Sequence, residues 1–458
     1  MIHTFEDARL SLLQSLVDDV ILRKPGTAGR PDLSHPLVQA VTAFARRKRP
    51  EDAAPPPAAS GGALDVAAAC VHLVGELFLA KLERNQPRVD ELEAELKEST
   101  CDPLWIEAMT EYLEYYGLLG HKNSIPYVRY SSLDDFVVET LPANARVVLI
   151  GDWGTGTAPA RRLMEQVARK QPDVVLHLGD IYYAGTERET RANFLDPLNE
   201  VLKRDTGGIP VYAVPGNHEM YSGGGGYYSM LSQLNPAPPF APQQAQQASY
   251  FCLRSKDGAW QFLGMDTGLH DHDPFDVTTG VTDLDDQEAA WHLDKIERFH
   301  ARGGRTILLS HHQLFSAFAG IGKLGHKPAG QEAYNPKLLN RFQDVLVAGK
   351  VAAWFWGHEH NLCVYEPYGP LEKGRCIGHG GVPVFTAQDP YTPLGALPEP
   401  PRLVSRPGGD EVRLSHDADG VYDVGYVLLE LNDAAGSAEV SYYQSSDEER
   451  PLYSERLG

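Results

Sequence analysis

The sequence predicts an α/β fold in which short parallel strands carry polar side chains to one edge of a buried sheet. The run Val147–Ile150 is apolar and β-branched and leads directly to Asp152. Val174–Leu178 repeats this pattern before Asp180, and a helical pattern lies between the two runs. This order indicates a βαβ unit with both aspartates at the carboxyl edge of the sheet, where α/β folds bind ligands.

The composition limits the kind of protein that can carry such a site. With 458 residues and 42% hydrophobic content, the chain can bury one large core and has room for a smaller second region. The formal net charge of −21 argues against a nucleic-acid backbone or an anionic membrane surface as the main partner. A phosphate-bearing substrate would need local positive charge, which a bound metal pair would supply.

The cysteines and the N-terminal sequence indicate the cellular compartment in which the protein is expected. Five cysteines are scattered without a C-x-x-C pair, so neither a disulfide framework nor a zinc ribbon is expected. The sequence as given shows no secretory leader and no apolar stretch long enough to span a bilayer. We therefore expect a cytoplasmic protein.

Two regions are predicted, a helical one over residues 1–123 and a catalytic α/β domain over residues 124–458. A Pro/Ala-rich segment at about residues 50–62 interrupts the helical patterns and is expected to be a linker. The helical region contains no chemical motif, so a packed cap or interaction module is the simplest interpretation. Substrate gating, partner binding and homo-oligomer formation through these helices remain open alternatives.

After the first βαβ unit, polar motifs again follow predicted strands. Pro210–Val214 leads to Asn217-His218-Glu219, Arg305–Leu309 leads to His311-His312, and Val351–Trp356 leads to His358-Glu359-His360. The stretch from Tyr221 to Ser249 is rich in glycine and proline, and we expect an irregular, flexible flap over the site. The other expected elements are helices over 158–170, 192–203 and 286–302, and strands over 146–150, 173–178, 250–253, 259–266, 374–377, 422–431 and 438–443, of which the last two form a hairpin.

The side chains at these strand ends offer oxygen and nitrogen donors and no cysteine. Mixed donors of this kind suit two adjacent iron, zinc or manganese ions, whereas calcium prefers oxygen alone. A single histidine at a strand end is more often a structural residue. Five such strand ends in one chain favour a metal site over chance.

These motifs resemble those of the calcineurin-like metallophosphoesterases. That family's signature combines Asp-x-His or Asp-x-Gly, Gly-Asp, Gly-Asn-His-Glu, a strand ending in His, and Gly-His-x-His, and the match covers about residues 145–385. The resemblance implies a two-sheet β-sandwich flanked by helices (αββα) and metal-dependent hydrolysis of phosphate esters.

Two details resemble purple acid phosphatases within this family. Gly154 stands where many members have a metal-binding histidine, and Tyr183 completes a Gly-Asp-x-x-Tyr motif, so a tyrosinate would replace the imidazole and favour Fe(III). The second metal would be Fe(II), Zn or Mn. The resemblance implies Asp180 as the ligand shared by both metals, with these further ligands: Asp152, Tyr183 and His360 for the first metal, and Asn217, His311 and His358 for the second.

The reaction implied is attack on phosphorus by a metal-activated hydroxide, with no protein nucleophile. His218 is the main candidate for protonating the leaving group and holding the phosphate, or it bonds only to a carboxylate such as Glu219. His312 and His379 are further candidates, although a strand continuing past His311 would turn His312 to the opposite side. Small phosphomonoesters are the expected substrates. A phosphodiester such as a cyclic nucleotide, or a non-catalytic metal-binding interaction protein, are the alternatives.

Overall fold

The computed structural model describes residues 88, 125–204, 207–271, 281–319, 321, 333–394, 397 and 399–458. The helices and linker expected within residues 1–123 lie outside this set, apart from Arg88. No helix among the described residues is both long enough and apolar enough to cross a membrane.

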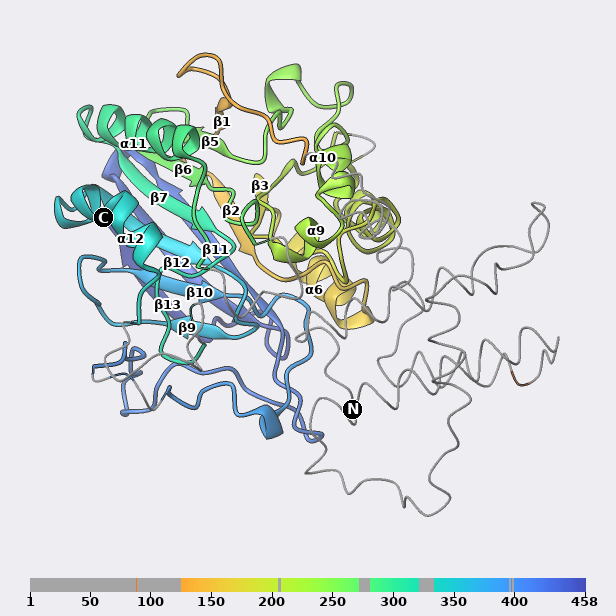
Figure 1. Cartoon of the computed structure of the whole chain (residues 1–458). Helices are drawn as coiled ribbons and strands as arrows, with labels where there is room; N and C mark the ends of the chain where they lie inside the picture. Colours follow the sequence, from red (N-terminus) through yellow and green to blue (C-terminus); the bar gives the residue numbers. More distant parts are fainter. Residues whose placement is uncertain are drawn as a thin grey trace, which may run out of the picture.

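Two β-sheets stack face to face and carry helices on their outer surfaces, which confirms the expected αββα architecture (Figure 1). The first sheet has the order β1-β5-β6-β7-β8-β10-β9, with bounds Val137–Leu141, Phe251–Ser255, Trp260–Gly264, Arg305–Ser310, Val351–Trp356, Gly374–Ile377 and Leu362–Val364. The second has the order β13-β12-β11-β2-β3-β4, with bounds Tyr453–Leu457, Ser437–Gln444, Gly425–Asn432, Arg146–Ile150, Val174–His177 and Val211–Ala213.

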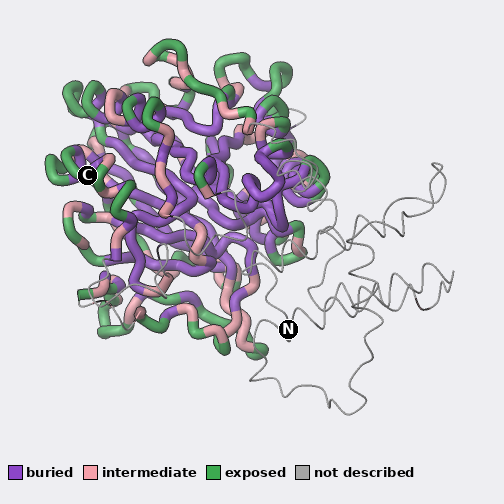
Figure 2. The backbone as a smooth tube through the Cα atoms, viewed as in Figure 1, coloured by how far each residue is buried: buried purple, intermediate pink, exposed green. Residues whose placement is uncertain are grey.

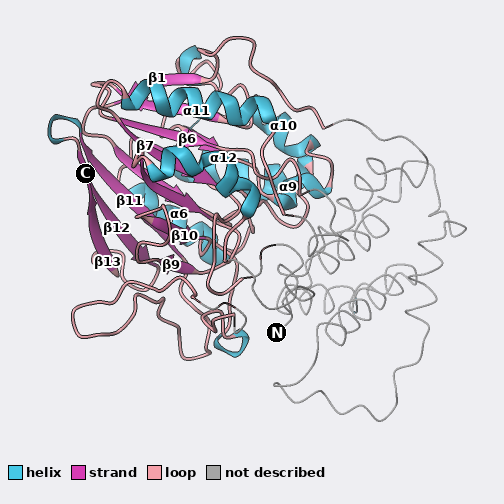
Figure 3. Cartoon of the chain, turned by 60° about the vertical axis from the view of Figure 1, so that its left-hand side comes forward, coloured by secondary structure: helices cyan, strands magenta, loops and turns pink. Residues whose placement is uncertain are grey.

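Helices cover both outer faces of this sandwich. Figure 3 shows α11 (Asp286–His300) and α12 (Pro336–Val347) lying across the first sheet. On the second sheet lie α6 (Ala158–Arg169), α8 (Asp196–Leu202) and α10 (Gly225–Leu231), whose apolar side chains share one cluster with the outer face of β2 and β3. Short helical segments are α7 (Glu187–Glu189), η1 (Thr190–Leu195), α9 (Asn217–Tyr221), η3 (Pro242–Gln244), η5 (Thr386–Gln388) and η6 (Asp433–Ala435).

The core between the sheets combines alternate side chains from both of them. Leu149 and Leu176 of the second sheet meet Leu309 and Phe355 of the first, and all four are fully buried. In Figure 2 the strands form a continuous buried layer. Burial on both faces explains why these strands read as unbroken apolar runs in the sequence.

The predicted βαβ unit is confirmed. β2 and β3 pair in parallel, with Val147 opposite Val174, and α6 connects them. The helix begins after Thr157, whose hydroxyl accepts the N–H of Ala160, and it buries Leu163 against the second sheet. The antiparallel pairing of β11 and β12 also confirms the predicted C-terminal hairpin.

The expectation of an irregular segment from Tyr221 to Ser249 is wrong. This stretch contains α10 and η3, and it buries Tyr227 and Met230 completely. Asn235 fastens the segment to β4, because its side chain accepts the N–H of Val211 and donates to the Val211 carbonyl. The glycines serve close packing here, since a Cβ on Gly226 would lie 2.2 Å from the carbonyl oxygen of Gly185.

One buried ion pair joins the two sheets. Arg375 of β10 donates to both carboxylate oxygens of Glu455 on β13, at 2.6 and 2.7 Å. Tyr442 of β12 and Lys373 donate to the same carboxylate at 2.7 and 2.8 Å. The side chains of Arg375 and Glu455 are 1% and 5% exposed, so water cannot stabilise either charge. Each charge is stabilised by the other instead.

We expect Glu455→Gln to lower the free energy of unfolding by about 3 kcal/mol, because the variant leaves the Arg375 charge buried without its counter-charge. Urea denaturation measures this change. Glu430→Gln is the matched control, because Glu430 pairs with Arg146 with its side chain 53% exposed and should contribute about 0–1 kcal/mol. Equal effects of the two substitutions would contradict this assignment.

The same ion pair gives a pH dependence. Burial alone would raise the pKa of Glu455, but its hydrogen bonds and charge interaction with Arg375, with Lys373 and Tyr442 adding to them, lower that pKa from 4.5 to about 2. The stabilisation is therefore complete above the ordinary pKa and is lost as the pH falls towards 2. The stability difference between the wild type and Glu455→Gln should shrink accordingly in denaturation curves measured across this acid range.

Candidate metal centre

The predicted ligands gather at one edge of the sandwich because each follows the end of a parallel strand. Asp152 follows β2, Asp180 follows β3 and Asn217 opens α9 after β4, all in the second sheet. His311 follows β7, and His358 and His360 follow β8 in the first sheet. Both sheets therefore contribute to the same site.

A first cluster brings together Asp152, Asp180 and His360. His360 Nε2 lies 3.3 Å from Asp152 Oδ1. The hydroxyl of Tyr182 stands between them, 3.0 Å from Asp152 Oδ1, 3.1 Å from Asp180 Oδ2 and 2.9 Å from His360 Nε2. Burial raises the pKa of Asp152 to about 6, although hydrogen bonding and charge interaction with His360 oppose this effect.

A second cluster lies directly beside the first. His311 Nε2 is 3.0 Å from Asn217 Oδ1 and 3.1 Å from His358 Nδ1, and the last two atoms are 3.1 Å apart. Asp180 Oδ1 lies 3.4 Å from His311 Nε2. Asp180 therefore presents one carboxylate oxygen to each cluster.

The chemistry of these donors fits a cation. His311 Nδ1 donates its proton to the carbonyl of Leu178 at 2.9 Å, so in the neutral ring Nε2 carries a lone pair. Asn217 donates from Nδ2 to the Tyr221 hydroxyl at 2.5 Å, which turns Oδ1 towards the histidines. Burial first, and neighbouring histidines second, hold the pKa values of His311 and His358 well below the usual range. Unprotonated imidazoles and a carbonyl oxygen thus converge in the form that binds metals.

The backbone at the ligands adopts a conformation that L-residues rarely use. Asp152, Asp180, His358 and His360 have φ values of 56°, 72°, 71° and 53°. Such left-handed residues are uncommon outside glycine, and strained residues of this kind cluster at functional sites. Close packing enforces the geometry, since a Cβ on Gly216 would lie 2.0 Å from Asp180 Oδ1.

The hydroxyl in the first cluster belongs to Tyr182, which is the neighbour of the predicted ligand Tyr183. After Asp180, Ile181 forms an isolated bridge with Gly154, the N–H of Tyr182 donates to the Gly154 carbonyl, and residues 182–184 form a turn. Ile181 enters the core, and the turn that begins at Tyr182 brings the Tyr182 hydroxyl beside Asp180. Tyr183 is buried, and its backbone N–H donates to Glu189. Gly154 is needed here, because a Cβ on it would lie 2.8 Å from the Asp180 carbonyl oxygen.

His218 lies against the first cluster and is 5% exposed. Its Nδ1 donates to the carbonyl of Tyr183 at 2.5 Å, and its Nε2 lies 3.8 Å from Asp180 Oδ2. Burial lowers the pKa of His218, while Asp180 acts in the opposite direction. Glu219 accepts the N–H groups of Asp180 and Gly216, at 3.1 and 2.9 Å, and so fixes both ligand loops.

The other two predicted histidines differ from each other in placement. His312 does not turn to the opposite side, because β7 ends at Ser310; its ring centroid lies 4.7 Å from that of His358. Thr267 and Asp271 hold its two nitrogens, each at 3.0 Å. His379 is fully buried against Gly425 and belongs to neither cluster.

The sequence reasoning missed Tyr182 and Asp271. Tyr182 lies in a turn after Asp180, so no strand periodicity in the sequence identifies it. Asp271 carried no signal, because it lies in a loop 41 residues from its partner His312.

Comparison with known proteins agrees with this arrangement. Residues 145–362 match the family model of calcineurin-like phosphoesterases. One solved structure that matches part of this chain is a purple acid phosphatase from yellow lupin (Lupinus luteus) seeds, with 18% identity over 69% of this chain and 55% of that one and a TM-score of 0.44. Another is a dimetal phosphatase from Danio rerio, with 14% identity over 68% of this chain and 98% of that one and a TM-score of 0.41. This chain thus spans little more than half the length of the lupin protein. No curated protein matches the sequence. The match to the family model, over the residues that form both donor clusters, shows that this chain carries a calcineurin-like phosphoesterase domain, the domain of a metallophosphoesterase family that binds two metal ions.

Proposed function

We propose that this protein hydrolyses small phosphomonoesters with two metal ions held in the adjacent clusters. The observation that carries the proposal is the placement of Asp180, with one carboxylate oxygen towards Tyr182 and the other towards His311. A carboxylate placed in this way can bind two cations at once. When bound, such ions supply positive charge for phosphoryl oxygens and acidify a water that attacks phosphorus.

Each cluster has its own ligands in this proposal. Asp152, Asp180, His360 and a tyrosine hold the first ion, and Asp180, Asn217, His311 and His358 hold the second. A phenolate is a hard anionic donor, which favours Fe(III) in the first position. The second position, with two imidazoles and an amide oxygen, suits Fe(II), Zn or Mn.

His218 supplies the proton for the leaving oxygen. The Tyr183 carbonyl fixes its ring through Nδ1, so Nε2 faces the clusters and is the nitrogen that can exchange a proton there. Burial lowers the pKa of His218, and the nearby charge of Asp180 acts in the opposite direction, towards the protonated ring. His312, held by Asp271, lies beside His311 and His358 and is a second candidate to contact the substrate.

Comparing a monoester with a diester of the same aryl alcohol tests the substrate class. We expect a higher kcat/KM for the monoester, and we expect Asn217→Ala to lower it by about 100-fold or more, because the second ion loses a ligand. His416→Ala is the control, since His416 is exposed. Faster diester hydrolysis would favour the phosphodiesterase alternative. Unchanged activity in Asn217→Ala would refute the ligand assignment.

Two neighbouring tyrosines provide a matched test of the iron ligand. The resemblance in sequence points to Tyr183, whereas the hydroxyl beside Asp152 and His360 belongs to Tyr182. We expect the native protein to contain iron and to show a visible phenolate-to-Fe(III) absorption band, and only one of Tyr182→Phe and Tyr183→Phe to abolish that band. From the contacts we expect it to be Tyr182→Phe. Active protein that is colourless and free of iron would refute the iron assignment.

The role of His218 predicts a dependence on the leaving group. His218→Asn should lower kcat by about 100-fold for an alkyl phosphate, whose leaving oxygen needs a proton. The loss should be much smaller for a nitrophenyl phosphate, whose leaving group departs as a stable anion. Equal losses for both substrates, at unchanged metal content, would assign His218 to phosphate binding or to packing.

A further inference from the structure

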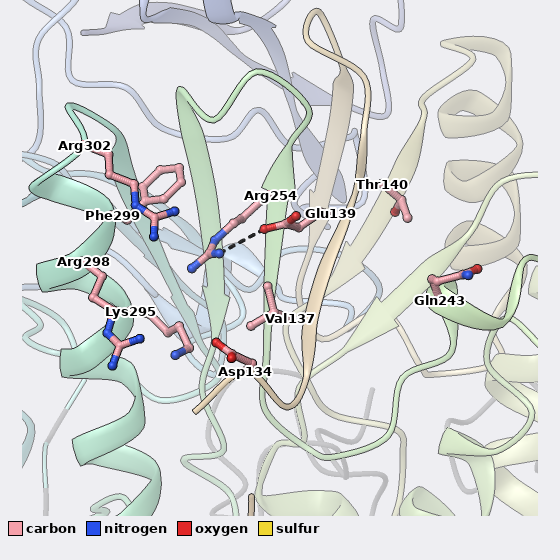
Figure 4. Close-up of a pocket in the computed structure, with 10 residues that line it drawn as sticks. All are labelled: Asp134, Val137, Glu139, Thr140, Gln243, Arg254, Lys295, Arg298, Phe299 and Arg302. Atoms are coloured by element: carbon pink, nitrogen blue, oxygen red, sulfur yellow. Dashed lines mark hydrogen bonds and ion pairs between the residues drawn. The ribbon is translucent and has the colours of Figure 1, made fainter. Parts of the chain in front are cut away.

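A cavity with a volume of about 490 Å³ opens between β1, β5 and the C-terminal half of α11, away from the metal centre. Figure 4 shows four cationic side chains converging there, three of them from α11 and the turn after it and one from β5. The cationic residues are Arg254, Lys295, Arg298 and Arg302. Two carboxylates, Asp134 and Glu139, also line the cavity, so cationic side chains outnumber acidic ones.

This cavity lies at the opposite edge of the first sheet from the metal clusters. The chain after α11 enters β7 at Arg305, and His311 follows the other end of the same strand. Arg254 pairs with Gln261 near the start of β6, which runs parallel to β7. A strand of this length spans roughly 20 Å. A small ligand in the cavity is therefore out of reach of the two clusters.

The cations on α11 share one helical face. Lys295, Arg298 and Phe299 follow the spacing i, i+3 and i+4 on the side of α11 that faces β5, and Arg302 lies in the turn after the helix. Asp294 partly neutralises this face through Lys295 and Arg298, at 2.8 and 2.7 Å. Arg302 is exposed, and its guanidinium makes no hydrogen bond or ion pair with any described residue.

The contribution from β5 is held in a fixed orientation. Arg254 donates to Glu139 at 3.1 Å and to Gln261 at 3.3 Å, and its guanidinium carbon lies 5.3 Å from the ring centroid of Phe299. The partial negative charge at the end of α11 would by itself favour Arg298 and Arg302. It explains neither Arg254, which belongs to a strand, nor Lys295, which is only 2% exposed.

We propose that this cavity is a second ligand site, which binds a small anion carrying more than one phosphate group. The whole chain has a formal charge of −21, so a concave surface with a majority of cations is a local exception that attracts anions. Guanidinium groups bind phosphate through two parallel hydrogen bonds, and most N–H groups of Arg298 and Arg302 are available for this. The volume exceeds that of a single phosphate and falls within the range of small-molecule sites. This site is independent of the proposed hydrolysis.

Methylenediphosphonate is a suitable probe, because its P–C–P bridge resists hydrolysis. Calorimetric titration of the full chain, after removal of metal ions by a chelator, should still show one binding event, since the cavity needs no metal. Arg302→Gln and Arg298→Gln should each weaken this binding by about 10-fold or more, the usual effect of losing charge-assisted hydrogen bonds. Arg450→Gln is the matched control, because its side chain is 87% exposed, pairs with Asp447 and carries the same charge.

Several outcomes would overturn the proposal. Binding that disappears with the metal ions would place the diphosphonate at the clusters. Equal weakening by Arg450→Gln would indicate a general effect of net charge, and wild-type affinity in Arg302→Gln would exclude the cavity. Succinate, a dicarboxylate, should bind at least 10-fold more weakly than the diphosphonate if phosphate geometry is recognised. Equal affinity for the two compounds would overturn the proposed selectivity for phosphate groups.

Discussion

Nitrogen and oxygen atoms of three side chains meet in the interior of this protein, and the surrounding structure holds them there. His311 Nε2, Asn217 Oδ1 and His358 Nδ1 lie within 3.1 Å of one another, and no proton is available between the first two. Lone pairs at such distances repel unless a cation lies among them. The Leu178 carbonyl and the Tyr221 hydroxyl hold the donors in this orientation through their outward-facing atoms. Such outer contacts determine which ring nitrogen remains free for a metal.

The same constraint accounts for the backbone of the site. Four of the ligands occupy the left-handed region, at a cost on the order of 1 kcal/mol or more for each. Burial on both faces of the strands offsets that cost, because Leu149, Leu176, Leu309 and Phe355 form the core between the sheets. Stability and function are thus divided within each strand. The apolar residues of the strand form the core of the sandwich. The few residues after its end adopt the strained left-handed conformation, which directs their polar atoms to one place.

The sequence was most informative where a strand led directly into a polar motif. Runs such as Val147–Ile150 are entirely apolar, which indicates strands buried on both faces. The βαβ unit and the strand ends could therefore be predicted. The short strand β1 could not, because its residues Val137–Leu141 alternate little and pair only with β5, more than 100 residues later in the chain. The prediction of an irregular flap from Tyr221 to Ser249 was wrong for a related reason. Its glycines suggest an irregular loop locally, whereas their actual role is contact with a distant backbone.

The site differs from the prediction by small shifts that only three-dimensional contacts determine. Tyr182 and Tyr183 are chemically identical neighbours, and the turn that begins at Tyr182 brings the Tyr182 hydroxyl beside Asp180. His312 remains beside the ligands because β7 stops at Ser310, one residue too early for strand alternation to apply. His379 is buried against Gly425, a neighbour 46 positions away that no local pattern reveals.

The two sheets contribute jointly to each cluster, so ions held there would also have a mechanical role. Asp152 and Asp180 come from the second sheet and His360 from the first, and the same division separates Asn217 from His311 and His358. Any sliding of one sheet over the other would pull the donors of both clusters apart. Ions held in these positions would link the two sheets at their carboxyl edge, in addition to the Arg375–Glu455 ion pair between β10 and β13. Ion binding would therefore favour the aligned arrangement of the two sheets, which their shared apolar core also holds.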